Sequence, residues 1–156
     1  MTLRKWTVGL AMLCASSSPV FAQDLKSPSV GEYVPRLGDI MSAAQTRHQK
    51  LWLAGKAQNW DLAAFELRQL KASLVEAAVL YSGIPISNVT TLEAPLNAVS
   101  AAIAAKDGKK FASAAADLTA GCNACHRTME RGFIVMKVPA DPQPFGNQAF
   151  PPERKP

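Results

Sequence analysis

Four stretches of the sequence place apolar residues three and four positions apart, which is the spacing of one face of an α-helix. They span residues 35–55, 60–81, about 94–107 and about 109–131, and no strand-like segment of any length interrupts them. In the first stretch the face consists of Leu37, Ile40, Met41, Ala44, His48 and Leu51. Because the connections between the stretches are short, the sequence predicts an all-α fold, an antiparallel four-helix bundle.

Residues that start or stop helices separate these stretches. Gly55 is expected to end the first helix, because glycine commonly follows a helix C-terminus. Asn59 is expected to cap the second helix, and Pro85 to keep the connection after that helix extended. The third helix begins either at a Thr90–Glu93 capping box or one residue later, with Pro95 as its first helical residue.

The fourth predicted helix contains the sequence Cys122-Asn123-Ala124-Cys125-His126. At about 100° per residue, both cysteines and the histidine fall within one arc of the helix. C-x-x-C-H is the attachment pattern of c-type haem: the two thiols reach the vinyl groups while the imidazole reaches the iron. The sequence therefore predicts one covalent haem c, attached at Cys122 and Cys125, with His126 as the proximal iron ligand.

Other uses of a C-x-x-C pair fit the sequence less well. A thioredoxin-like dithiol is expected in a βαβ context, whereas this region has helical spacing. A zinc site needs further ligands, and His48 is the only other histidine in the chain. A haem-free metal-binding module that uses Cys122, Cys125, His126 and His48 remains one alternative.

The N-terminus predicts export. Residues 1–22 combine a basic start, a short apolar run and small residues at the −3 and −1 positions, which describes a signal peptide cleaved after Ala22. The apolar run is shorter than the roughly 20 residues that span a bilayer, so no membrane span is expected after cleavage. Cys14 leaves with the signal peptide, and the exported chain then holds only the two motif cysteines. These features predict a periplasmic protein without a disulfide framework.

The rest of the chain divides into a polar lead-in (23–34), the haem-binding bundle (35–133) and a Pro-rich tail (134–156). The net charge is +5, and it falls to +3 when the signal peptide is removed. A modest excess without a basic stripe or a recognisable motif gives no ground for nucleic-acid binding. It is compatible with mild steering toward an acidic protein partner.

A four-helix bundle with C-x-x-C-H on its last helix resembles the class II c-type cytochromes, the cytochrome c′ family and its low-spin relatives. The similarity covers about residues 35–133 and includes Arg36 to Met41, which is similar to the Arg/Met pattern of that family's distal helix. Met129 and Glu130 depart from it, since the family usually has an aromatic residue and an arginine there. The resemblance implies single-electron transfer between redox partner proteins, and homodimers paired through the first two helices are common in the family. No nucleophile, general base or substrate pocket can be identified, so we do not expect an enzyme.

The sixth iron ligand must come from the face of the pocket opposite His126. The resemblance implies Met41, and His48, two turns later on the same face, is the alternative. Met129 lies on the proximal side, and Met136 would need a sharp return of the chain. Methionine ligation raises the reduction potential and bis-histidine ligation usually lowers it, while an open position binds small gases. A five-coordinate haem protein that binds NO or CO for scavenging or sensing is therefore the alternative function.

Four further residues are candidates for contact with the haem. Arg36, Arg47 and Arg131 could pair with its propionates, or could be ordinary surface charges. Trp52, one turn after His48, could pack against the porphyrin, or could belong to the bundle core.

Overall fold

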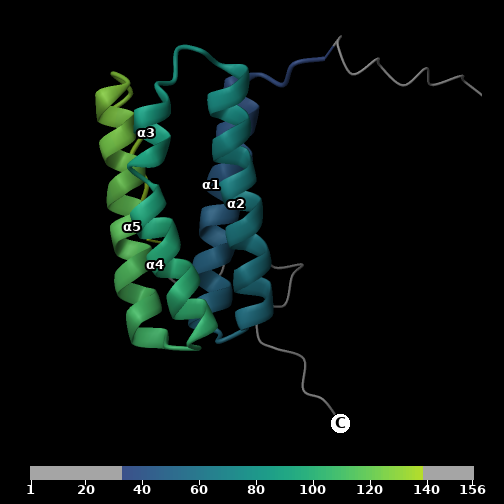
Figure 1. Ribbon diagram of the computed structural model, residues 1–156, viewed down its shortest axis with the longest axis vertical. Coiled ribbons are helices and arrows are strands. Elements are labelled where there is room, and N and C mark those ends of the chain that lie inside the picture. Colours follow the sequence, from purple (N-terminus) through teal and green to yellow (C-terminus); the bar gives the residue numbers. More distant parts are fainter. Residues whose placement is uncertain (1–32, 139–156) are drawn as a thin grey trace, which may run out of the picture. The chain divides into compact units, whose positions relative to one another are not determined.

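The computed structural model describes residues 33–138, and all of its helices lie in one compact unit that begins at Val34. In chain order the helices are α1 (Leu37–Lys56), α2 (Trp60–Leu80), α3 (Ile86–Thr90), α4 (Glu93–Ala104) and α5 (Gly108–Thr128). α1 packs chiefly on α2 and α4 chiefly on α5, and the two pairs meet where α2 contacts α4 and α1 contacts α5. Figure 1 shows α1, α2, α4 and α5 running in alternating directions. The predicted all-α bundle is therefore confirmed, with the short helix α3 added.

The predicted signal peptide (1–22) and nearly all of the lead-in (23–34) lie outside the described residues, as does the tail from 139 onward. Within residues 33–138, no helix has the length and apolar character needed to cross a membrane. The first tail residues, 134–138, are described and lie against α1 and α5.

Polar side chains start two of the long helices. The Asn59 side-chain oxygen accepts a hydrogen bond from the Leu62 amide at 3.2 Å, which confirms the predicted cap of α2. Asp107, expected near the end of the third predicted helix, instead caps α5, where its carboxylate accepts from the amides of Lys109 and Lys110. These bonds hold the pKa of Asp107 below its usual value.

The prediction for the segment between α2 and α4 was wrong. Residues 86–90 were expected to be extended, yet they form α3, with Pro85 as its N-cap. Proline restricts the residue before it and is well tolerated at a helix start, so the chain after Pro85 is free to be helical. α4 begins at Glu93 without a side-chain cap, and no capping box forms because the Thr90 hydroxyl donates to the Ser87 carbonyl. Pro95 lies in the first turn of α4, where no intrahelical amide bond is lost.

Gly55 does not end α1, as the sequence suggested, but lies buried inside the helix, which continues to Lys56. A Cβ atom at Gly55 would overlap the ring of Phe111 on α5. The glycine therefore allows a close approach of the α1 backbone to an aromatic ring.

The ends of α1, α4 and α5 are made by residues other than glycine. Gln58, Lys106 and Glu130 have φ angles of 57°, 53° and 56°, in the left-handed region. In each case this residue and the next donate their backbone N–H groups to carbonyls of the last helical turn, which is the Schellman pattern. Glycine is the usual residue at this position, so these three turns could not be predicted from the residues that form them.

The core is centred on Phe111, of which 1% is exposed. Its ring stacks on Trp52 with centroids 6.2 Å apart and meets Trp60 edge-on at 6.0 Å. Trp52 is thus a core residue. The other largest buried side chains are Leu51, Leu70, Leu118, Glu66 and Val99. No residue of α5 after Thr119 is buried, so the well-packed core ends before the Cys-x-x-Cys-His motif.

Candidate functional site

The two motif cysteines lie on α5 as free, partly buried thiols, and Cys122 packs against the core. Burial raises the pKa of the Cys122 thiol to about 11, with a smaller contribution from neighbouring Cys125. Burial also raises the pKa of Cys125. Dithiol oxidoreductases need a lowered thiol pKa, because the thiolate is the nucleophile. These environments therefore argue against redox exchange by this pair.

The imidazole of His126 is held by one backbone group. Its Nδ1 lies 2.7 Å from the carbonyl oxygen of Ile134. A carbonyl only accepts hydrogen bonds, so we assign the proton of the neutral ring to Nδ1, which leaves Nε2 with its lone pair free. A histidine that binds a metal through one nitrogen usually donates from the other in this way. The side chain of His126 thus has the tautomer that an axial iron ligand requires.

The carbonyl of Ile134 reaches His126 because the chain reverses after α5. The turn contains a hydrogen bond from the Arg131 amide to the His126 carbonyl (2.7 Å) and one from the Ile134 amide to the Arg131 carbonyl (2.8 Å). We call residues 133–138, which run back along α5 after this turn, the return segment. Met136 was not expected to be the sixth ligand, because it would need a sharp return of the chain.

Asn123, the first variable residue of the motif, fastens the return segment. Its side-chain oxygen accepts from the amide of Met136 at 2.7 Å, and its side-chain nitrogen donates to the carbonyl of the same residue at 3.0 Å. This role of Asn123 was not predicted, because an asparagine inside the motif carries no signal of a partner thirteen residues away.

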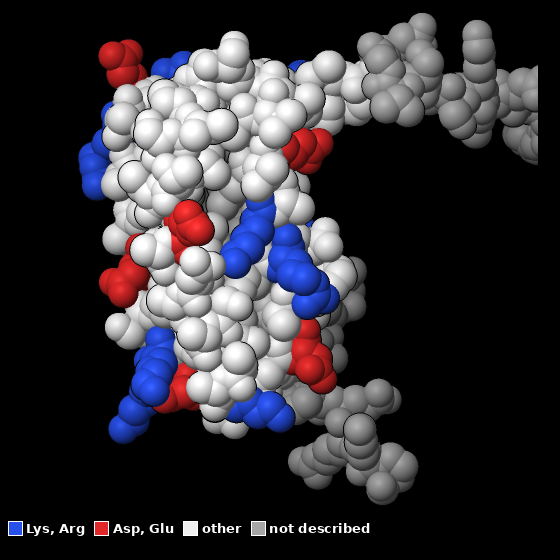
Figure 2. All heavy atoms as spheres, in the orientation of Figure 1, with Lys and Arg blue, Asp and Glu red and all other residues white. Residues whose placement is uncertain are grey.

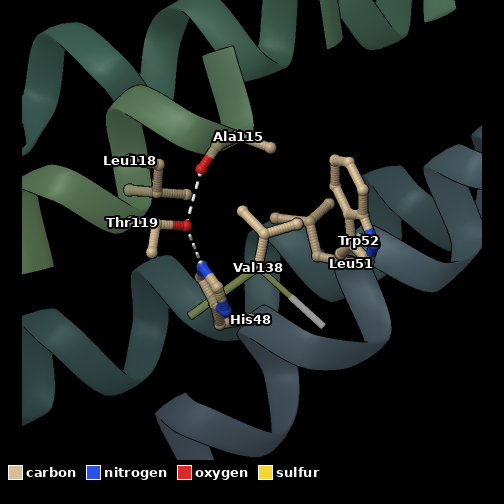
Figure 3. A pocket seen from close by; sticks show the side chains of 7 residues that line it. All are labelled: His48, Leu51, Trp52, Ala115, Leu118, Thr119 and Val138. Carbon is tan, nitrogen blue, oxygen red and sulfur yellow. Dashed lines mark hydrogen bonds between the residues drawn. The ribbon is translucent and has the colours of Figure 1, made fainter. Parts of the chain in front are cut away.

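His48 is buried and is hydrogen-bonded to Thr119 on α5 (Figure 3). Its Nε2 lies 2.8 Å from the Thr119 hydroxyl, and that hydroxyl donates to the Ala115 carbonyl at 2.8 Å. Since the hydroxyl proton is used on Ala115, Thr119 accepts from Nε2–H of His48. Burial lowers the pKa of His48, which favours the neutral ring. Thr119 precedes His126 by seven residues, so His48 meets α5 about 10 Å along the helix from the motif histidine.

α1 and α5 run in opposite directions (Figure 1). Counting residues from the contact between them therefore places Met41 at the level of His126. His48 pairs with Thr119, and moving seven residues toward the start of α1 and toward the end of α5 reaches Met41 and His126. Both steps cover about 10 Å in the same direction. Met41 is partly buried. Of the two candidate sixth ligands, the methionine shares the level of the motif.

The three candidate arginines have protein partners. Arg47 forms an ion pair at 3.1 Å with Glu66, whose side chain is only 2% exposed. Arg36 pairs with Asp39 at 3.0 Å on the surface, and Arg131 donates to the Glu130 carbonyl. On the face in Figure 2, lysines and arginines are interspersed with acidic residues. The buried carboxylate makes Arg47 the arginine most firmly committed to the fold.

Two hollows border His48, and neither is lined by the motif residues. One, shown in Figure 3, has no room for a water molecule and lies among Leu51, Trp52, Thr119 and Val138. The other, of about 270 Å³, is open to the surface between α1 and the return segment. Within residues 33–138, no three His, Cys, Asp or Glu side chains gather closely enough to hold a metal ion. That finding argues against the four-ligand site through Cys122, Cys125, His126 and His48.

No family model, curated protein or solved structure matches the chain. The chemistry of the site follows from its side chains. Two free thiols one helical turn apart, beside an imidazole whose Nε2 is available, form a donor set for two thioether bonds and one axial nitrogen ligand. The residues therefore fit a covalently attached haem.

Proposed function

We propose that the protein is an exported c-type cytochrome with a single haem, which carries single electrons between protein partners. The observation that carries this proposal is the hydrogen bond between His126 Nδ1 and the Ile134 carbonyl oxygen, which lie 2.7 Å apart. It fixes the ring in the tautomer that leaves Nε2 for iron, directly beside two unpaired thiols. A haem bound here supplies a one-electron iron couple whose potential the axial ligands tune.

The residues of the chain have distinct parts in this proposal. Cys122 and Cys125 would hold the porphyrin through two thioether bonds. His126 provides the proximal nitrogen, and its Nδ1–H bond makes Nε2 a stronger donor. Holding the group covalently on one helix keeps it in place through repeated electron transfers.

Met41 is the sixth ligand that the geometry supports best. It lies level with His126, whereas His48 is tied to Thr119 about two turns away and has its Nε2 engaged. Methionine–histidine ligation raises the reduction potential of haem iron. We therefore infer an electron carrier of comparatively high potential.

Exposed apolar residues at the motif end of the bundle support a docking role. Val79 near the end of α2, Ile86 in α3 and Phe133 after α5 are 76%, 72% and 79% exposed. These segments lie at the same end in Figure 1. Transient redox complexes use small interfaces, because turnover needs rapid release. Docking of a partner at this end would bring it to the side of the motif.

The test is production in a host with cytochrome c maturation, followed by mass spectrometry and optical spectroscopy of the processed protein. We expect the added mass of one haem and a low-spin spectrum that carbon monoxide leaves unchanged. Met41→Ala should abolish the methionine-to-iron charge-transfer band, while the matched variant His48→Ala should retain it.

Two results would contradict the proposal. Absence of the haem mass would remove it altogether. A high-spin ferrous form that binds carbon monoxide would replace electron transfer with gas binding. Loss of the charge-transfer band in His48→Ala alone would reverse the ligand assignment.

A further inference from the structure

We propose that Asn123 is a positioning residue: its side-chain amide pins the return segment so that the Ile134 carbonyl reaches His126 Nδ1. The inference deepens the proposed cytochrome function, on which its consequence for the haem rests. The contact itself involves only residues of this chain. Asn123 would thus control the orientation and donor strength of the motif histidine without touching it.

The pairing between Asn123 and Met136 has the geometry of a short backbone ladder. An amide side chain presents one acceptor and two donors, and here it satisfies both the N–H and the C=O of a single residue, at 2.7 and 3.0 Å. Alanine offers neither group and aspartate only the acceptor. Of these three residues, only asparagine makes both bonds.

The two contacts on the return segment are in register. Asn123 and His126 are three residues apart on α5, so their side chains neighbour each other on one face. Ile134 and Met136 are two residues apart on the return segment, with both backbone groups of Met136 bound to Asn123 and the Ile134 carbonyl 2.7 Å from His126 Nδ1. Fixing Met136 on Asn123 therefore presents the Ile134 carbonyl to His126.

Side-chain packing contributes little to holding this segment. Phe133, Ile134 and Val135 are 79%, 44% and 62% exposed. The hydrogen bonds to Asn123 and His126, with the turn at Arg131, are the contacts by which the start of the segment is attached to α5. Loss of two of these bonds should free the Ile134 carbonyl while the bundle stays folded.

The consequence for a haem follows from the role of an outer-shell hydrogen bond. A proximal histidine that donates from Nδ1 is a stronger electron donor at Nε2, which stabilises ferric iron. Without Asn123 the bond to Ile134 weakens, and the reduction potential should shift to more positive values.

The experiment compares Asn123→Ala with Asn88→Ala in the full processed chain. Asn88 is a matched control, because its side-chain amide also donates to a residue at this end, the sulfur of Met129 at 3.2 Å, and not to the return segment. The first readout is the tautomer of His126, from ¹⁵N chemical shifts of protein made without haem attachment. The second is the rate of limited trypsin cleavage after the exposed Lys137. The third is the reduction potential of the haem-loaded protein.

We expect Asn123→Ala to mix the two tautomers of His126, to speed cleavage after Lys137 several-fold and to raise the potential, with the far-ultraviolet spectrum unchanged. Asn123→Asp should fall between Asn123→Ala and wild type, and Asn88→Ala should match wild type. An unchanged tautomer in Asn123→Ala would overturn the proposal, even if cleavage were faster. So would an unchanged potential. If no haem attaches to the wild-type chain, the proposed function fails, while the tautomer still tests the positioning role.

Discussion

The two ends of the bundle are held together by different means. At the end where α1 joins α2 and α4 joins α5, Phe111 is enclosed by Trp52, Trp60 and the bare backbone of Gly55. At the other end the last turns of α5 have no buried residue, and hydrogen bonds from Asn123 and His126 hold the adjoining backbone.

The residues that contribute most to folding stability and the residues of the candidate site therefore lie at opposite ends of the bundle. Close packing makes the first end sensitive to changes in volume, since interiors are as dense as organic crystals. Exposed residues in the last turns of α5 and the return segment can change with a smaller loss of folding free energy, because α5 has no buried residue after Thr119. Substitutions should therefore sort by position: those around Phe111 should alter unfolding, and those at the motif should alter spectra, potential and local exposure.

The largest effect is expected for Phe111→Ala. Removing a fully buried ring from the contact with both tryptophans should destabilise the protein by about 4 kcal/mol, through lost burial and an unfilled cavity. Urea unfolding followed by circular dichroism measures this. Phe133→Ala is the control, because this phenylalanine at the motif end is 79% exposed and its loss should change the midpoint little. Equal effects of the two variants would contradict the contrast between the ends.

Gly55→Ala should destabilise by about 2 kcal/mol, because the new methyl group overlaps the Phe111 ring and the packed helices must shift. Gly38 is the matched control on the same helix: nothing lies within 4 Å of a Cβ there, so Gly38→Ala should stabilise by about 0.5–1 kcal/mol through helix propensity. Urea midpoints give both values. Similar shifts of the same sign would show that Gly55 acts through backbone entropy alone.

A smaller effect, dependent on pH, is expected between the two ends, at His48. Its folded-state pKa is lowered by burial, so the unfolded chain binds a proton more readily. The contribution of the neutral ring is complete above the unfolded pKa of about 6.5 and is lost as the pH falls through the folded value. His48→Gln, which can still donate to Thr119, should therefore reduce the loss of stability between pH 7 and pH 5. Chemical unfolding at several pH values measures the difference, and parallel curves for the two proteins would contradict it.

The helices could be predicted from the sequence, because the apolar residues of a buried helix face recur three and four positions apart. Asn59 was found in the same way, since a cap has a fixed place before an apolar run. Features made by contacts between distant residues were missed. Gly55 suggested a helix end, whereas its role depends on a ring 56 positions later, and nothing near Arg47 pointed to the buried carboxylate of Glu66.

In the candidate site too, features set by nearby residues were predicted and features set by distant residues were not. The identity of the motif and its place on the last helix followed from local spacing. The return of the chain after α5 did not, because Glu130 makes a left-handed turn that glycine usually makes, and because Asn123 acts on a partner thirteen residues away. That Met41 lies at the level of His126 could be inferred only from the contact between His48 and Thr119.

The close contact of Gly55 with the Phe111 ring also affects the spacing of α1 and α5. This contact sets how closely α1 and α5 approach there. Met41 lies fourteen residues away, or about 21 Å, toward the N-terminus of α1. Between these points His48 on α1 donates to Thr119 on α5, so the two helices are joined at a second place about 10 Å from Met41. The separation of α1 and α5 at the motif therefore depends on both contacts.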